Sequence, residues 1–210
     1  NELCDSSLKD ILTNNYIENI NDTMFHSFIF QILSGIYSIH KLCNICHFDL
    51  HGGNILISNI EANGYWLYSI NNSDYYIPNY GYILKIWDFG RSMILHTDDF
   101  IDICSQIIHQ CKRFYKEPFK KNPKLEKKIF KKLNKTKIKI IIFAFDIWRI
   151  ISYLFSKFKK DNYLSLKFKN TLELLSNIKK DCENNWVHLM FNANEISNTP
   201  EIFMKYLLDK

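Results

Sequence analysis

The segment HFDLHGGNILI, residues 47–57, decides how this 210-residue chain is interpreted. Within it, Asp49 and Asn54 stand five positions apart and are bracketed by short, β-prone apolar runs. Gly52 and Gly53 lie between them, in a chain with only six glycines, and glycine adopts backbone angles that other residues avoid. The pattern predicts a tight turn that places two polar side chains at the edge of a strand.

A second segment, KIWDFGR at residues 85–91, supplies another carboxylate. Asp88 stands near the end of a strand expected over 82–89, and Gly90 follows it closely. Proteins hold Mg²⁺ with one or two carboxylate or amide oxygens, while phosphates and water complete its octahedron. A further Asp outside the metal shell can orient a hydroxyl for in-line attack on a phosphate. The two segments together contain the side chains that such a site needs.

Outward from these segments, apolar periodicity predicts helices on both sides of a short β-region. The longest, about 23–42, is apolar around much of its circumference, which is typical of a helix buried on more than one side. Asp5, and Asn21 or Asp22, are the candidate N-caps. The expected helices cover about 5–12, 23–42, 140–155, 162–179 and 200–209, and an inserted hairpin or long loop covers 59–81. One mainly helical domain is therefore expected.

Composition excludes several classes of protein. With 47% hydrophobic and 23% charged residues, the chain is too apolar to be disordered. No run reaches about 18 uncharged apolar residues and no secretory leader is visible, so we expect an intracellular protein without a membrane partner. The net charge of +5 hides a basic block, 112–139, with 13 basic and two acidic residues. This block is either a site for an anionic partner, such as phosphates or nucleic acid, or a solvated surface insertion.

Six cysteines in a chain without a secretion signal predict reduced thiols. Cys43 to His47 fit the C-x-x-C-H pattern of covalent haem attachment, but the sequence signals neither export nor a second axial ligand, so no haem is expected. The same residues could also form a zinc site. Its four ligands would fall within nine residues, which leaves no loop to wrap the ion. Those ligands would be Cys43, Cys46, His47 and His51.

In combination, the two polar segments resemble the catalytic loop and the Asp-Phe-Gly segment of the protein-kinase-like superfamily. Residues 2–8 look like the hinge that binds adenine, and the helix expected over 23–42 stands where the helix before the catalytic loop should stand. Residues 145–148, Phe-Asp-Ile-Trp, look like the start of the buried helix after the activation segment. The resemblance covers about 1–155. It implies a mainly α (α+β) fold, the C-terminal lobe of a protein kinase from the hinge onward, over 1–210.

A narrower resemblance is to the kinase-like proteins of large DNA viruses. It depends on the end of the insertion at 75–81, on Arg91-Ser92 after the glycine, and on Asp-Leu-His in the catalytic loop. The abundance of Asn, Ile, Lys, Tyr and Phe, which is common in AT-rich genomes, is compatible with such an origin. This resemblance implies a viral protein of the host cytoplasm or the virion.

The resemblance also implies a role for each polar residue of these segments. Asp49 would orient the acceptor hydroxyl or accept its proton, while Asn54 and Asp88 would bind Mg²⁺. His51 stands where protein kinases usually carry a Lys that contacts phosphate. The implied structural residues at the site are His47, Gly90 and Asp146.

Two of these structural residues have a specific implied function. His47 would brace the Asp-Phe-Gly turn, and Asp146 would brace the backbone of the catalytic loop. For the nucleotide, Leu56 would form the floor beneath adenine, and backbone groups of Glu2 and Cys4 would reach its edge.

The expected activity is that of a serine/threonine protein-kinase-like phosphotransferase, which uses ATP and Mg²⁺ and acts on a protein substrate. Because the chain starts at the hinge, we expect the small lobe, with its Gly-rich loop and phosphate-pairing Lys, to be absent from it. No Ala-Pro-Glu follows Asp88 at the usual distance. Two alternatives stay open. One is a pseudokinase or scaffold that binds partners through the fold and the basic insertion at 112–139, and the other is a small-molecule kinase, which the Asp-Leu-His-Gly-Gly-Asn run favours.

Overall fold

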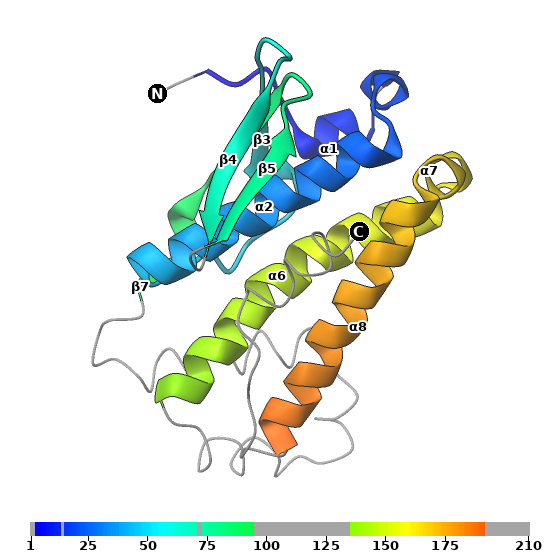
Figure 1. The fold of residues 1–210 in the computed structure, drawn as a ribbon. Coiled ribbons are helices and arrows are strands. Elements are labelled where there is room, and N and C mark those ends of the chain that lie inside the picture. The colour runs from blue at the N-terminus through cyan, green and yellow to red at the C-terminus, as the bar shows by residue number, and fades with distance from the viewer. Residues whose placement is uncertain (1–2, 14, 71–72, 95–134, 192–210) are drawn as a thin grey trace.

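The structure of the chain, a computed structural model, describes residues 3–13, 15–70, 73–94 and 135–191 (Figure 1). The helices are α1 (Leu8–Ile11), α2 (Asp22–Cys43), α6 (Lys135–Lys160), α7 (Asn162–Lys167) and α8 (Lys169–Phe191), with 3₁₀ turns η1 (Asn15–Asn19), η2 (Gly52–Asn54) and η3 (Phe89–Arg91). The strands are β1 (Ser6–Ser7), β2 (Ile45–Cys46), β3 (Ile55–Asn59), β4 (Tyr65–Ile70), β5 (Ser73–Pro78), β6 (Tyr82–Ile86) and β7 (Met93–Ile94). Glu2, most of the basic block 112–139 and the helix expected over 200–209 lie outside the described residues.

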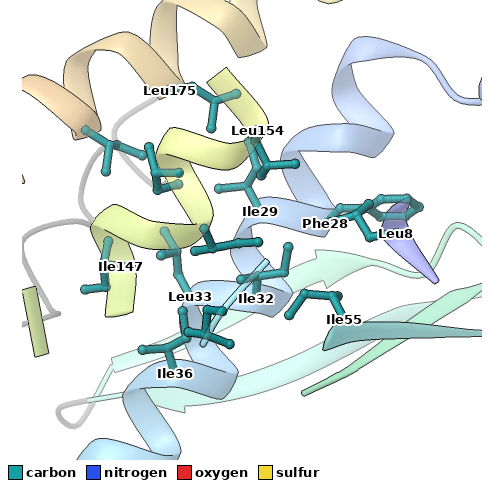
Figure 2. Close-up of a cluster of buried hydrophobic side chains, with 14 of the residues drawn as sticks. Leu8, Phe28, Ile29, Ile32, Leu33, Ile36, Ile55, Ile147, Leu154 and Leu175 are labelled. Carbon is teal, nitrogen blue, oxygen red and sulfur yellow. The ribbon is translucent and has the colours of Figure 1, made fainter. Parts of the chain in front are cut away.

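Helix α2 lies between the strands and the pair formed by α6 and α8 (Figure 1). One apolar core joins these layers, and α2 buries side chains around much of its circumference in it, so the prediction that this helix is buried on more than one side is confirmed. Figure 2 shows side chains of α2 meeting those of α6, α8, β3 and α1 in this core. Its labelled members are Leu8, Phe28, Ile29, Ile32, Leu33, Ile36, Ile55, Ile147, Leu154 and Leu175.

The start of α2 is capped as its sequence predicts. Asn21 is extended, and its side-chain oxygen accepts a hydrogen bond of 2.9 Å from the backbone N–H of Met24. The neighbouring Asp22 serves another helix, because its carboxylate accepts hydrogen bonds from the backbone N–H groups of Asn170 and Thr171 at the start of α8. Two adjacent polar residues therefore satisfy the N-termini of two helices.

The first helix is shorter than predicted and has a different cap. Asp5 is not its N-cap. Its backbone N–H donates to the carbonyl of Ile57, and the next two residues form β1, which pairs with β3. Ser7 caps α1 instead, in a capping box in which Ser7 and Asp10 each accept a hydrogen bond from the other's backbone N–H. The Asp5 carboxylate accepts the backbone N–H of Asn59 at 2.7 Å, which ties the start of the chain to the end of β3.

Strand β3 is the centre of a small antiparallel sheet with the order β1-β3-β6, and β6 is one of its edges. The strand expected over 82–89 ends at Ile86, and the chain then turns into η3. Gln31 of α2 binds the outer edge of β6, because its side-chain amide accepts from the Leu84 N–H and donates to the Tyr82 carbonyl. A helix side chain thus satisfies backbone groups that a further strand would otherwise satisfy.

Within 59–81 the structure has a hairpin, in which β4 and β5 pair in register from Tyr65–Pro78 to Ile70–Ser73. One face of this hairpin packs on α2, where the ring of Phe30 lies 5.0 Å from that of Tyr68 and 6.4 Å from that of Tyr75. The alternation of inward aromatic and outward side chains follows from the two-residue period of a strand.

The C-terminal helices are longer than predicted, since α6 covers Lys135–Lys160 and α8 continues to Phe191, and one of them is divided. The segment expected to form one helix over 162–179 is divided at Phe168, whose backbone angles are not helical. The Phe168 ring is fully buried, 5.1 Å from the Phe158 ring and 5.3 Å from the Phe25 ring. The break thus coincides with a side chain whose removal from water is worth about 1.5–3 kcal/mol.

Within the described residues, none of the helices combines the length and the apolar character needed to cross a lipid bilayer.

Candidate active site

The polar loop, residues 47–54, runs from the end of β2 to the start of β3. Phe48 has a positive φ of 62°, an angle that is rare for a bulky residue and that persists only when surrounding contacts enforce it. The next residue, Asp49, has a side chain that is 19% exposed, while Leu50 beyond it is fully buried. The strained residue therefore turns the chain so that a carboxylate reaches the surface between two buried apolar side chains.

The Asp146 carboxylate of α6 enforces this conformation from below. One oxygen accepts the backbone N–H of Phe48 at 2.8 Å, and the other accepts that of His47 at 2.7 Å. This is the contact that the kinase resemblance implies for Asp146. The group is fully buried, and burial by itself would raise its pKa. The hydrogen bond and charge of His40 oppose this effect, as do the hydrogen bonds from the His47 backbone and the Cys46 thiol. Together they outweigh burial and lower the pKa of Asp146 below its usual 3.8.

His40 and Cys46 complete this buried cluster. His40 Nε2 lies 2.9 Å, and the Cys46 thiol sulfur 3.1 Å, from the same Asp146 oxygen. Among the described residues, His40, Cys46 and Asp146 form the one group whose donor atoms come close enough to hold a metal ion. Because Asp146 also accepts two backbone N–H groups, the arrangement is accounted for as a hydrogen-bond network that anchors the loop.

The C-x-x-C-H residues do not gather around a common point. Cys43 is exposed at the end of α2, whereas Cys46 is fully buried against Asp146. His47 and His51 have separate hydrogen-bond partners, described below. Among the described residues, these four side chains do not bring their ligand atoms close enough together to hold a zinc ion.

His47 links the polar loop to the Asp-Phe-Gly turn. Its Nε2 lies 2.8 Å from the carbonyl oxygen of Trp87, so this nitrogen carries the proton, and its Nδ1 accepts the backbone N–H of Asp49. The imidazole ring also lies 5.0 Å from the ring of Phe89. The resemblance assigns His47 a bracing position under this turn, and these contacts are consistent with it.

Asn54 makes a second link between the same two segments. Its side-chain Nδ2 donates to the backbone carbonyl of Asp49 at 2.9 Å. The backbone carbonyl of Asn54 accepts the backbone N–H of Trp87 at 2.9 Å. Asp88, the next residue, has a positive φ of 61° and an exposed side chain, and its Oδ1 accepts the N–H of Gly90 at 3.3 Å. The two candidate metal ligands are thus on segments that are hydrogen-bonded to each other.

The two glycines of the loop have different neighbours. A Cβ atom at Gly52 would lie 2.5 Å from the Tyr153 ring of α6, so only glycine allows this close approach. A Cβ at Gly53 would lie 3.1 Å from the ring of His51, whose Nδ1 accepts the Gly53 N–H and begins η2. His51 therefore caps the turn, and the phosphate contact that the resemblance implies for it stays a prediction.

Two arginines that the sequence did not mark as site residues flank Asp49. Arg149 Nη2 of α6 lies 3.3 Å from Asp49 Oδ1, and Arg91 Nη1 of η3 lies 3.6 Å from Asp49 Oδ2. The Arg149 side chain is 23% exposed and that of Arg91 is 69% exposed. One signal was available: Arg149 follows Asp146 by three positions, and residues three apart on a helix lie on the same face.

The structure describes two of the three residues that the resemblance assigns to adenine, Cys4 and Leu56. Leu56 is half-buried in β3, where it pairs with Ser7 and Lys85. Cys4 is half-buried, and Glu2 lies outside the described residues. A cavity of about 260 Å³ has its lining from α2, β6, Ile55 and Phe89. The walls of that cavity include neither Asp49 nor Asn54, although Ile55, which follows Asn54, and Phe89 of the Asp-Phe-Gly turn line it.

Comparison with known proteins gives two partial similarities and no matching family model. The chain is 43% identical over 68 residues to serine/threonine-protein kinase 380R of Invertebrate iridescent virus 6, and 39% identical over 62 residues to serine/threonine-protein kinase 019R of Frog virus 3. Both names give the kinase assignment provisionally. The matches cover 31% and 29% of this chain, but only 13% and 7% of the two viral proteins. The chain therefore spans a small part of the length of the relatives that it matches.

Proposed function

We propose that this chain contributes the large lobe of a viral serine/threonine protein-kinase-like phosphotransferase, whose substrates are ATP and a protein hydroxyl. One observation carries the proposal. His47 and Asn54 of the polar loop both bind the backbone of Trp87, so the segments that bear Asp49 and Asp88 are held together. The kinase names of the two viral relatives support the same activity, and they favour a site of action in the infected host cell or the virion.

Asn54 and Asp88 fit a magnesium ion by the chemistry of their atoms. The Nδ2 of Asn54 is committed to the Asp49 carbonyl, which leaves the amide oxygen as the ligand atom. Asp88 adds an exposed carboxylate at the start of η3. Carboxylate and amide oxygens are the ligands that Mg²⁺ takes up beside phosphates and water. Bound there, the ion would offset the negative charge of the phosphate oxygens during transfer.

Asp49 is the residue that we expect to receive the proton of the acceptor. As the hydroxyl oxygen bonds to the γ-phosphorus of ATP, its proton passes to the Asp49 carboxylate. The bond from that phosphorus to the β,γ-bridging oxygen breaks, and ADP leaves with the electron pair. Asp49 is suited to this step because its backbone N–H and carbonyl are both held, by His47 and Asn54 respectively.

The test uses the whole native protein and radiolabelled ATP with three acceptor panels: basic proteins, acidic proteins and aminoalcohols. Asp49→Asn should lower the rate of transfer by roughly 10²- to 10⁴-fold, the usual contribution of a general base. Asp88→Asn should weaken Mg²⁺-dependent binding of ATP. The matched control is Asp74→Asn, which removes an exposed carboxylate of β5 that binds Ser69, and it should leave both properties unchanged.

The outcomes separate the competing functions. Transfer that persists in Asp49→Asn would rule out the proposed role of this residue. An inactive wild-type protein that still binds its partners would favour the scaffold. Transfer to aminoalcohols alone would favour the small-molecule kinase, the alternative that the Asp-Leu-His run supports.

A further inference from the structure

We propose that Arg149 is the positioning residue of Asp49: it holds one carboxylate oxygen so that the other faces the acceptor hydroxyl. This inference rests on the proposed function and goes beyond the residues that the kinase resemblance assigns. It begins from the two ion pairs of Asp49, which engage different oxygens. Arg149 lies 3.3 Å from Oδ1, and Arg91 lies 3.6 Å from Oδ2.

The two arginines differ in how firmly they are held. Arg149 projects from α6, a helix of 26 residues, and about three quarters of its side chain is buried. Arg91 belongs to a three-residue turn, and more than two thirds of its side chain is exposed. Exposed ion pairs contribute little because solvent screens them and the side chains lose entropy, whereas a pair fixed by packing keeps its geometry. Arg149 is therefore the partner that can determine the orientation of the carboxylate.

Helix α6 holds the loop at two points that lie one helical turn apart. Asp146 binds the backbone N–H groups of His47 and Phe48, and Arg149 binds the side chain of the residue that follows them. Because residues three apart share a helix face, both anchors approach the loop from the same side. One rigid element thus determines the backbone angles before Asp49 and also the direction of its carboxylate.

This division of oxygens has a chemical consequence. A guanidinium stays protonated and has no acceptor atom, so Arg149 cannot take the acceptor's proton and acts on Asp49 by orienting it. The proton then passes to Oδ2, whose partner Arg91 is exposed and can be displaced by the acceptor. Orientation of this kind matters because a shift of 1 Å in a reacting group can lower a rate about a hundredfold.

The experiment measures kcat, the KM for ATP and the thermal unfolding midpoint in the whole native protein. Arg149→Met keeps the apolar stem that packs in α6 but removes the charge. We expect kcat to fall on the order of a hundredfold, with the KM for ATP unchanged. Arg149→Lys should lose less, and Arg91→Gln should lose less than Arg149→Met. Lys160→Met, which removes an exposed cation from the last turn of the same helix, is the matched control and should behave as wild type.

A double-mutant cycle excludes a purely structural role. In the Asp49→Asn background, Arg149→Met should cause no further loss of rate, because its effect acts through the missing carboxylate. An equal loss in both backgrounds, or a folded Arg149→Met with wild-type kcat, would overturn the inference. If that variant does not fold, wild-type kcat in Arg149→Lys would overturn it, because a lysine lacks the planar fork. A wild-type protein without any transfer would refute the proposed function itself, and the inference with it.

Discussion

The Asp146 carboxylate fixes the loop conformation, stabilises the fold and makes that stability depend on pH, so its replacement is the most informative perturbation. Its two oxygens accept four hydrogen bonds, from His40, Cys46, His47 and Phe48, and the side chain is fully buried. Asp146→Asn removes the charge and keeps the shape. Asp146→Ala removes all four acceptor contacts.

The magnitude follows from these contacts. If the Asn carbonyl takes the position that binds three donors, its NH₂ group faces the N–H of Phe48, and that buried donor loses its acceptor. An unsatisfied buried donor costs about 1–3 kcal/mol, and a neutral acceptor binds the other three more weakly, so Asp146→Asn should lower the free energy of unfolding by about 2–4 kcal/mol. Asp146→Ala should cost about 3–5 kcal/mol, as is typical when one member of a buried pair is removed.

The loss should also depend on pH. Because the pKa of Asp146 is lower in the fold than its ordinary value of 3.8, the carboxylate stabilises the fold fully above about pH 5. That contribution is lost as the pH falls below 3.8 toward the lowered pKa of the folded state. The stability difference between wild type and Asp146→Asn should therefore be largest near pH 7 and should shrink toward pH 3.

The assay is urea unfolding of wild type and both variants at pH 7 and pH 3, followed by tryptophan fluorescence. Asp74→Asn, an exposed carboxylate on the hairpin, should stay within about 0.5 kcal/mol of wild type at both values of pH. The reasoning would be refuted by an Asp146→Asn variant within about 0.5 kcal/mol of wild type at pH 7, or by a difference that is the same at both values.

Three further predictions concern single residues. Gly52→Ala should lower stability by about 1–3 kcal/mol, measured by thermal unfolding, because its Cβ would meet the Tyr153 ring at 2.5 Å; a variant as stable as wild type would contradict this packing. Cys43 should react with iodoacetamide in the native protein at pH 8, whereas Cys46 should not, since burial and then the Asp146 charge raise the pKa of the Cys46 thiol; mass spectrometry of the labelled sites decides between them. Gln31→Leu should cost about 1–3 kcal/mol and speed amide hydrogen exchange in β6, because a backbone N–H of that strand would lose its acceptor.

Elements that depend on local patterns could be predicted from the sequence. The periodicity of α2 and its Asn21 cap involve residues within one or two turns of each other, and the hairpin is marked by turn residues between apolar runs. The errors occurred where distant residues decide. The start of α1 depends on pairing with β3, and the break at Phe168 coincides with a ring that packs against Phe25.

The candidate site shows the same division. Spacing within two short segments was enough to identify the polar residues, because those residues are close in sequence. The contacts that hold them involve Asp146 and Arg149 of α6, which lie about 100 positions further along the chain. Spacing within a loop contains no information about which distant helix face will lie beneath it, and only the three-residue interval between Asp146 and Arg149 offered a sequence signal.

The anchoring of the polar loop by α6 has a consequence for the order of events during synthesis. The residues that contact Asp146 precede it by 98 to 106 positions. At translation rates of 5–20 residues per second, the loop is made roughly 5–20 s before its anchor. During that interval nothing from α6 can enforce the positive φ of Phe48, and the Cys46 thiol lacks its Asp146 partner. The loop can therefore take up its final conformation, and Cys46 its protected position, only once α6 has been made.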